Sequence, residues 1–196
     1  MPTAPTNPAI NVQESGEKGA LQRAKAILED THSRRMETIG ENHFETLASK
    51  YQLASVYIYS GELLKSEKFS IRAWRGMKDQ LGEKNPDTLH TEIRLSWAYC
   101  ERDKNDEAEK LQRRTLDNMV EVLGAIHADT TIAMANLALT LSKIKGKIGE
   151  AEELKLKVVD LREIVLGGNH PDRFLARANL AFTYDQQNRW KEAEDL

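Results

Sequence analysis

The chain has 196 residues, of which 40% are hydrophobic and 30% charged, enough for about one to one and a half average soluble domains with a core. Lys and Arg number 28 against 31 Asp and Glu, and this nearly balanced charge excludes a broadly basic nucleic-acid binder. The single cysteine, Cys100, excludes an internal disulfide framework and a cysteine-rich zinc site.

The N-terminal residues carry no recognisable targeting signal. They lack the basic start and the apolar core of a secretory signal, and no apolar run in the chain reaches the length of a membrane-spanning helix. We therefore expect a soluble protein that does not contact membranes, in the cytoplasm or, as the alternative, in the nucleus. The first residues are rich in Thr and Pro, and we expect residues 1–16 to form a flexible tail.

The rest of the chain repeats itself with a period of about 42 residues. A Leu-Gly or Ile-Gly pair marks the start of each unit, and the sequences that follow each pair align in the same register. The predicted units span residues 40–81, 82–123, 124–166 and 167–196, and the last one is truncated. The glycines that mark them are Gly40, Gly82, Gly124 and Gly167.

The sequence pattern of each unit predicts two antiparallel helices, which we name helix A and helix B. In the second unit, Asn85 is a candidate N-cap, and Pro86 suits the first position of a helix A over residues 86–102. A polar break then precedes a helix B over residues 105–122, which ends where Gly124 can adopt a left-handed conformation. No segment shows the sustained alternation of a β-strand.

Residues 17–39 match only the second half of a unit. Ala24, Ile27, Thr31 and Met36 fit helix B of a preceding repeat, so we expect a half-repeat here. In the full units, one small residue recurs in each helix, which lets the two helices of a pair approach closely. These residues are Ala54, Ser96, Ala138 and Ala181 in helix A, and Ser66, Ala108, Ala151 and Ala193 in helix B.

The pattern Leu-Ala/Ser-x-x-Tyr, a short polar break and Glu-Ala-Glu resembles the tetratricopeptide repeat (TPR). The 42-residue period and the seam, which reads LGEKNPDT in one unit and LGGNHPDR in another, resemble its kinesin-light-chain subtype. The unit over 40–81 departs most, with Phe44 where proline is usual. The resemblance implies an all-α, right-handed α–α superhelix of antiparallel helix pairs, a TPR solenoid, over residues 17–196. It also implies a non-catalytic scaffold that binds a peptide or a partner helix in its concave groove.

No group of residues points to an enzyme, a metal site or a cofactor. His43, His127 and His170 share one seam position in successive units, but they lie a whole repeat apart, too far to bind one metal. We expect them to cap helices instead. Cys100 has no histidine at a matching spacing, so we expect it to be a packed side chain rather than a nucleophile.

Two other motifs have structural interpretations as well. The segment 167–170 contains two glycines but does not follow a strand, so we interpret it as a seam between repeats rather than a phosphate-binding loop. The Glu-Ala-Glu motifs place carboxylates at i and i+2, which do not share a helix face. We expect these carboxylates to be solvated near the N-termini of the B helices.

The candidate binding residues occupy three positions of helix A, spaced i, i+3 and i+7, which form one stripe along the helix. By the resemblance, this stripe lines the concave groove. Amide side chains there offer a donor and an acceptor to a peptide backbone, and the apolar members offer pockets. The candidates are Gln52, Arg94, Trp97, Asn136, Leu139, Lys143, Asn179, Phe182 and Gln186.

The partner predicted by these residues is a protein or peptide. Arg94 and Lys143, flanked by Trp97, favour an acidic peptide with one large apolar anchor. The alternative for Trp97, Leu139 and Phe182 is that they pack against neighbouring A helices. We expect no nucleic acid, membrane or cofactor as a partner.

The sequence also allows two other functions. The array fits the ligand-sensing or autoinhibitory arm of a larger signalling NTPase, or a motor cargo adaptor that resembles a kinesin light chain. The sequence also stops early in the last helix B, which leaves the final helix A with little cover. We therefore expect either a fragment of a longer array or self-association through exposed terminal helices.

Overall fold

The computed structural model describes residues 8–166 and 170–196, with the side chains of residues 8–18 and of residue 166 left out. Two compact units divide the chain, residues 1–77 and residues 78–196, and their boundary falls inside the third helix. The residues that the structure describes are helical apart from short connections, and no strand occurs among them.

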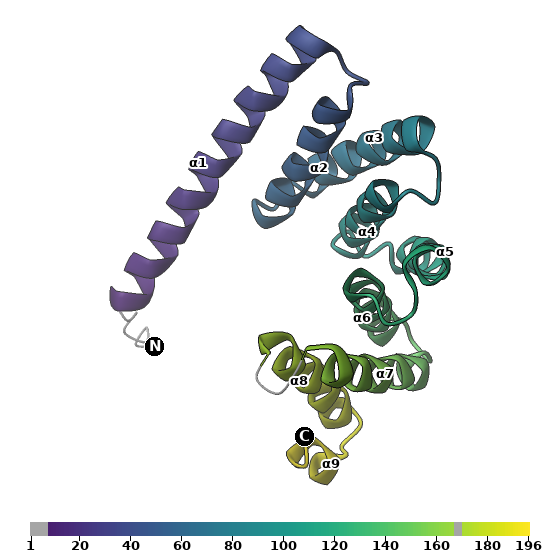
Figure 1. Cartoon of the computed structure of the whole chain (residues 1–196). Coiled ribbons are helices and arrows are strands. Elements are labelled where there is room, and N and C mark those ends of the chain that lie inside the picture. The colour runs from purple at the N-terminus through teal and green to yellow at the C-terminus, as the bar shows by residue number, and fades with distance from the viewer. Residues whose placement is uncertain (1–7, 167–169) are drawn as a thin grey trace. The chain divides into compact units, whose positions relative to one another are not determined.

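The first unit contains α1 (Pro8–Ile39), α2 (Phe44–Tyr59) and most of α3 (Leu63–Leu81), drawn from purple to blue in Figure 1. α2 packs against α1, where the Tyr57 hydroxyl donates to Glu29 at 2.9 Å. α2 also packs against α3, where the Ser66 hydroxyl donates to the carbonyl oxygen of Ala54 and the rings of Tyr57 and Phe69 meet edge to face. α2 is therefore the central helix of this unit.

The structure places residues 8–16 in a helix, where part of a flexible tail over residues 1–16 was expected. α1 begins at Pro8 and continues without a break to Ile39, beyond the half-repeat predicted over 17–39. Proline suits the first position of a helix, and each residue added to an existing helix gains a hydrogen bond without a new nucleation cost. The remaining residues, 1–7, lie outside the described residues.

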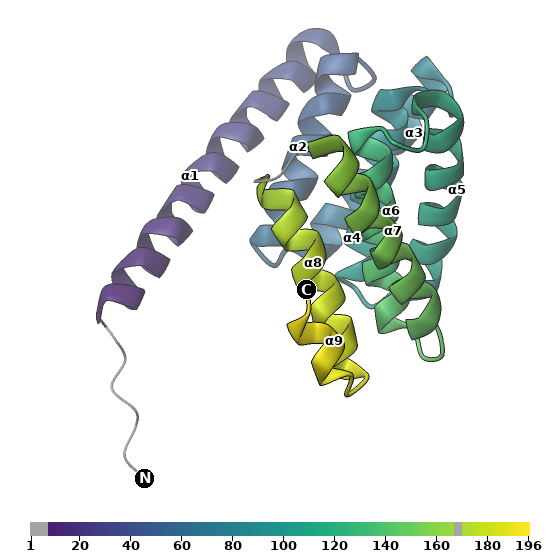
Figure 2. The ribbon, with the colours of Figure 1, turned by 60° about the horizontal axis from the view of Figure 1, so that its bottom comes forward.

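The described residues of the second unit contain the end of α3 and six complete helices, which run from teal to yellow in Figures 1 and 2. Each helix packs against the next along the chain from α4 to α9, and α4 also contacts α6. α4, α6 and α8 are the A helices, and α5, α7 and α9 are the B helices. Their bounds are α4 (Pro86–Cys100), α5 (Asn105–Leu123), α6 (Ala128–Lys143), α7 (Ile148–Leu166), α8 (Pro171–Gln186) and α9 (Trp190–Glu194).

The predicted helix starts are confirmed. The Asn85 side chain accepts a hydrogen bond from the backbone N–H of Asp87 at 2.9 Å, with Pro86 at the first helical position. The ring Nδ1 atoms of His43, His127 and His170 accept the equivalent bond from the residue two positions later, at 3.1–3.2 Å. The three histidines therefore cap α2, α6 and α8, as expected.

The prediction that the glycines after the B helices have positive φ is confirmed for Gly40, Gly82 and Gly124. Gly124 follows α5 with φ 90° and ψ 158°, and Gly40 and Gly82 have nearly the same φ. The ψ of Gly124 is extended rather than αL, in a region that only glycine occupies readily. Gly167, the fourth glycine of this set, lies outside the described residues, as do the seam residues Gly168 and Asn169.

The recurrent small residues are buried where the two helices of a pair meet. Ala54, Ala108, Ala138 and Ala151 are fully buried, whereas Ala193 in α9 is only partly covered. Large residues of the A helices fill the space beside them. Leu53, Leu95, Leu137 and Leu180 are all at most 2% exposed. The stacking of small against large side chains therefore forms the core, as the repeat pattern predicts.

One ion pair recurs between successive B helices. Glu109 of α5 binds Lys147 at the start of α7, and Glu152 of α7 binds Arg189 at the start of α9 at 2.7 Å. Lys25 of α1 binds Glu62 at the start of α3 in the same register, with the two charges exchanged. The partners lie 37 or 38 residues apart in all three pairs, slightly less than one repeat, because each pair joins a position within one helix to the start of the equivalent helix in the next repeat. α1 therefore occupies the place of a B helix.

The expectation of solvated carboxylates in the Glu-Ala-Glu motifs is wrong for the second glutamate of two motifs. The side chain of Glu109 is 9% exposed and that of Glu152 is 18% exposed, because each binds the cation that begins the next B helix. Glu107, the first glutamate of its motif, is exposed as expected.

Candidate binding groove

A cavity of about 620 Å³ opens in the second unit, and we call it the groove. All three A helices of the unit contribute to its walls, and the B helices α5 and α7 contribute one residue each. Its lining is mostly apolar. The residues are Ile93, Arg94, Trp97, Cys100, Glu101, Gln112, Ile132, Asn136, Leu139, Thr140, Ser142, Lys143, Lys155, Phe182 and Gln186.

Seven of the nine sequence-predicted candidates line the groove together: Arg94, Trp97, Asn136, Leu139, Lys143, Phe182 and Gln186. Asn179 lies next to it, in a small cavity of about 10 Å³ that shares Leu139 and Lys155 with the groove. Gln52 is exposed on α2 in the first unit and is not among the residues that line the groove. The i, i+3, i+7 stripe thus predicts most of this wall.

The apolar candidates are not consumed by packing between A helices. Leu139 keeps 41% of its surface exposed and Phe182 keeps 59%, while Ile132 of α6 adds a further 41%-exposed apolar side chain. Leu139 and Phe182 are therefore not buried by packing against neighbouring A helices, which was the alternative interpretation. They present apolar surface to the groove.

On α4, three candidate positions form one connected edge. The Arg94 guanidinium lies over the Trp97 ring at 5.0 Å from its centroid. The indole Nε1 of Trp97 donates to Glu101 at 3.0 Å. These residues share the i, i+3, i+7 stripe, so the Trp97 indole lies between the Arg94 cation and the Glu101 carboxylate. The two contacts fix the orientation of the ring before a peptide binds.

The lining also contains a buried lysine that the stripe does not include. Lys155 of α7 is 5% exposed, and its Nζ donates to Ser142 at 2.9 Å and to Thr183 at 2.6 Å. Both acceptors are neutral hydroxyls. Burial lowers the pKa of Lys155, because no carboxylate among the described residues offsets the loss of hydration.

Gln112 of α5 is the second lining residue that comes from a B helix, so the stripe of helix A does not include it either. It lies 43 residues before Lys155, at the same position of its own helix B, and it is also 5% exposed. Its Oε1 accepts no hydrogen bond within the described part of the chain. Gln112 and Lys155 each follow the recurrent small residue of their helix B by four positions, on a stripe that is otherwise buried. A polar residue at this position is the sequence signal that could have identified both.

Cys100 behaves as a packed residue. It is 8% exposed, and its thiol lies 3.1 Å from the Thr140 hydroxyl. That hydroxyl donates its own proton to the Asn136 carbonyl at 3.1 Å, so the thiol is the donor to Thr140. Burial raises the pKa of the Cys100 thiol, which disfavours the thiolate that nucleophilic chemistry requires.

The described residues offer no arrangement for a metal ion. No group of three or more His, Cys, Asp or Glu side chains comes together among them. None of the described helices combines the length and the hydropathy that are needed to cross a bilayer. The lining residues of the groove are suited to hydrogen bonding, ion pairing and apolar contact.

Comparison with known families identifies the class of protein. The sequence profile described as "Tetratricopeptide repeat" matches residues 45–121 and 129–196, which together make up most of the chain. The protein therefore belongs to the tetratricopeptide repeat family. No curated protein sequence matches the chain.

Solved structures share this fold over nearly the whole chain. A Podosopora anserina protein described as a kinesin light chain with nearly identical TPR-like repeats has a TM-score of 0.74 and 23% identity, covering 93% of this chain and 86% of that one. BtubC (BKLC) from P. vanneervenii has a TM-score of 0.76 and 16% identity, covering 92% and 71%. The apo form of RapI has a TM-score of 0.73 and 13% identity, covering 94% and 64%.

These matches confirm the predicted fold class, an all-α superhelix of antiparallel helix pairs. With the 42-residue period, they also support the kinesin-light-chain-like form of the repeat. Repeats of this kind are typically interaction scaffolds without catalytic chemistry of their own.

Proposed function

We propose that the protein is a non-catalytic scaffold that binds an acidic peptide, or an acidic partner helix, in the groove of its second unit. The groove is large enough for several side chains of a partner, and the A helices that line it are held in place by buried leucines. Its partner would be a protein in the cytoplasm. Catalysis, a cofactor and nucleic acid have no part in this proposal.

The charge of the lining is the observation that carries the proposal. Arg94, Lys143 and Lys155 contribute three cations, whereas Glu101 contributes the only carboxylate among the lining residues. Exposed Leu139 and Phe182 lie in the same cavity. A positive, largely apolar groove complements a peptide that carries carboxylates around one apolar anchor.

Charge reversal tests the proposal. Arg94→Glu combined with Lys143→Glu should weaken the binding of acidic peptides by at least about tenfold, because two cations that attract the carboxylates of the peptide are replaced by anions. The dependence of the affinity on salt should also fall, because salt screens that attraction in the wild type. Fluorescence anisotropy of peptides selected from a random displayed library, at two salt concentrations, measures both effects.

The matched control reverses two exposed lysines on B helices, Lys110→Glu and Lys157→Glu, which gives the same change in net charge outside the groove. This variant should bind like the wild type. Equal affinity and salt dependence of the groove variant and the wild type would show that the peptide binds elsewhere.

Other roles fit the same groove. A cargo adaptor or the sensing arm of a larger signalling NTPase would use it to hold a segment of another protein. The likeness to the Podosopora anserina protein, which is described as a kinesin light chain, favours the first of these. Self-association through the terminal helices is a separate proposal. It is supported by the exposure of Phe174 and Leu175 on α8 and of Trp190 on α9.

A further inference from the structure

We propose that Lys155 is the anion-recognition point of the groove, and that it binds a single Asp or Glu carboxylate of the partner peptide between α6 and α8. This inference rests on the proposed function and deepens it, since it names the residue and the chemical group that the peptide must supply. Lys155 lies on a B helix, outside the stripe of helix A residues.

Other buried charges of this chain have partners of opposite charge. Lys50 in the first unit pairs with Glu41 at 2.8 Å, and Glu92 of α4 pairs with Arg114 at 2.6 Å. The side chains of Lys50 and Glu92 are at most 3% exposed. A buried ion without a partner of opposite charge is costly, and this chain supplies partners at both places.

Lys155 differs because, among the described residues, its Nζ has only the hydroxyls of Ser142 and Thr183 as acceptors. An ammonium group has three donors, so one donor remains for a third acceptor. No carboxylate among the described residues occupies that place. Arg162, about two turns further along α7 and also buried, donates to the carbonyl oxygen of Asp172, which is a neutral acceptor as well.

The position of Lys155 makes its third donor available to a ligand. The residue lines the groove and also the small cavity beside it, where Leu139 is a shared wall. Exposed Phe182, on the helix that also supplies Thr183, adds apolar surface in the groove. A carboxylate that reached Nζ would be partly removed from water, where its attraction to an ammonium is stronger than at the surface.

The hydroxyl partners explain why a lysine can be buried there without unfolding the repeat. Ser142 donates its own proton to the Ala138 carbonyl at 2.9 Å, and Thr183 donates to the Asn179 carbonyl at 3.2 Å. Both hydroxyls therefore keep a partner when the ammonium is removed. Lys155→Met retains the apolar stem and removes only the charged end, so we expect this variant to fold.

The proposal also specifies the peptide. One acidic side chain should be required at a fixed position, next to an apolar or aromatic side chain that contacts Leu139 and Phe182. Selection of a displayed random dodecapeptide library on the full chain should return such a motif. The same selection on Lys155→Met should lose the acidic position but keep the apolar one.

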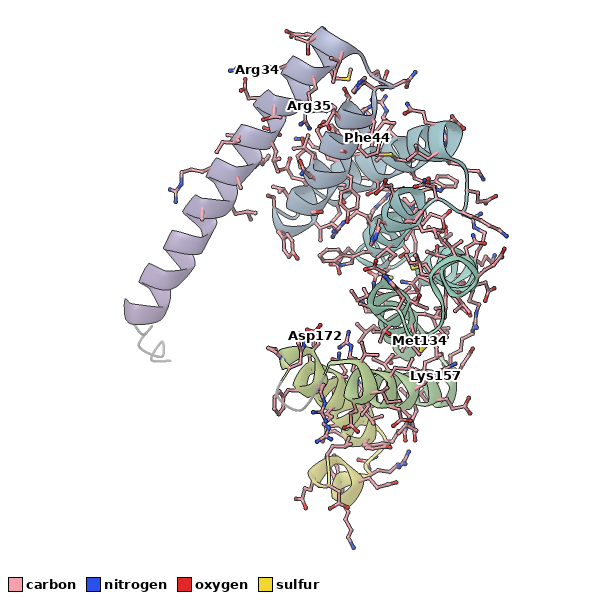
Figure 3. All side chains as sticks on the ribbon, viewed as in Figure 1. Arg34, Arg35, Phe44, Met134, Lys157 and Asp172 are labelled. Carbon is pink, nitrogen blue, oxygen red and sulfur yellow. The ribbon has the colours of Figure 1, made fainter. Side chains whose placement is uncertain are left out.

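Affinity measurements then isolate the contact. The selected peptide and its Glu→Gln form are titrated into the wild type, Lys155→Met and Lys157→Met, with the last as control because Lys157 is exposed on the same helix (Figure 3). We expect at least a tenfold loss for the Gln peptide with the wild type, and a much smaller loss with Lys155→Met. Lys157→Met should behave like the wild type.

Nitrogen-15 spectra of the lysine side chains supply a readout that a purely structural role would not move. In the free protein the pKa of Lys155 is lowered by burial. Binding of the acidic peptide should raise that pKa, because a nearby carboxylate favours the ammonium form. The Gln peptide should leave it unchanged.

The outcomes separate the two proposals. Peptides that bind without an acidic requirement, or an acidic requirement that persists in Lys155→Met, would overturn this inference and leave the scaffold proposal standing. If selection enriches no peptide on the wild-type chain, both proposals fail.

Discussion

At the scale of single residues, Gly124 shows most clearly how one position ends a helix. The residue combines φ 90° with ψ 158°, and a Cβ placed there would meet no atom within 4 Å. The space is open, so the requirement for glycine comes from the backbone alone. Such dihedral angles are accessible to glycine and costly for every L-residue with a side chain.

Gly124→Ala should therefore lower the free energy of unfolding by about 1–3 kcal/mol, because alanine incurs the backbone strain without gaining a contact. Urea unfolding followed by circular dichroism measures the change. Gly149→Ala is the matched control, since Gly149 lies in helix α7 and a Cβ there also meets nothing. That control should be neutral or stabilising by up to about 1 kcal/mol.

A loss in both variants, or in neither, would contradict this account of Gly124. The comparison is informative because both substitutions add the same methyl group in open space. They differ in the sign of φ at the substituted residue.

At the scale of the elements, the ion pairs between successive B helices connect one repeat to the next. Glu109 of α5 binds both Lys147 and Arg113, and Arg113 in turn binds Glu150 of α7. Burial raises the pKa of Glu109, but the hydrogen bonds from Lys147 and Arg113 outweigh it, so the pKa lies below its ordinary value. The ionised form is thus the one that the folded state stabilises.

The sign of the pH dependence follows from this shift. A carboxyl whose pKa is lowered by folding stabilises the protein above its unfolded pKa of 4.5, and this contribution disappears as the pH falls through the lower, folded-state pKa. Glu109→Gln should cost about 1.5–3 kcal/mol at pH 7, the range for hydrogen bonds to charged groups. The difference between Glu109→Gln and the wild type should shrink below pH 4.5.

Urea unfolding at pH 7 and at several acidic pH values measures that difference directly. Glu107→Gln, an exposed glutamate on the same helix, is the control and should change stability little at any pH. A cost for Glu109→Gln that stayed constant across the acidic range would mean that ionisation of Glu109 is not involved.

At the scale of the whole molecule, apolar side chains of α8 and α9 raise the question of self-association. Phe174 is 61% exposed, Leu175 is 55% exposed and Trp190 is 57% exposed. If these residues contact a second copy, the molar mass from light scattering should rise with protein concentration. Leu175→Glu with Trp190→Glu should hold the protein at the mass of one chain.

Leu64→Glu provides the comparison, because Leu64 of α3 is a 70%-exposed leucine in the first unit. It should associate like the wild type. A wild-type mass that equals one chain at every concentration would rule out self-association through these helices.

The candidate site was predictable to the extent that one helix face encodes it. The stripe at i, i+3 and i+7 of helix A brings Arg94, Trp97 and their equivalents together, since residues at these spacings share a face. It could not include Lys155, which reaches the groove from a B helix. A lysine on a buried face is expected to be rare, and only the packing of α6, α7 and α8 shows where its ammonium lies.

The repeat, the two helices of each unit, their caps and the packing of small against large side chains could be predicted from the sequence, because these features depend on contacts that recur within about 42 residues. Which charges are neutralised could not be predicted. Glu109 and Glu152, which were expected to be solvated, instead bind cations of the next repeat, and Lys155 is a buried cation whose acceptors among the described residues are hydroxyls. The cost of a buried charge depends on groups from neighbouring repeats, and a one-dimensional pattern does not contain that information.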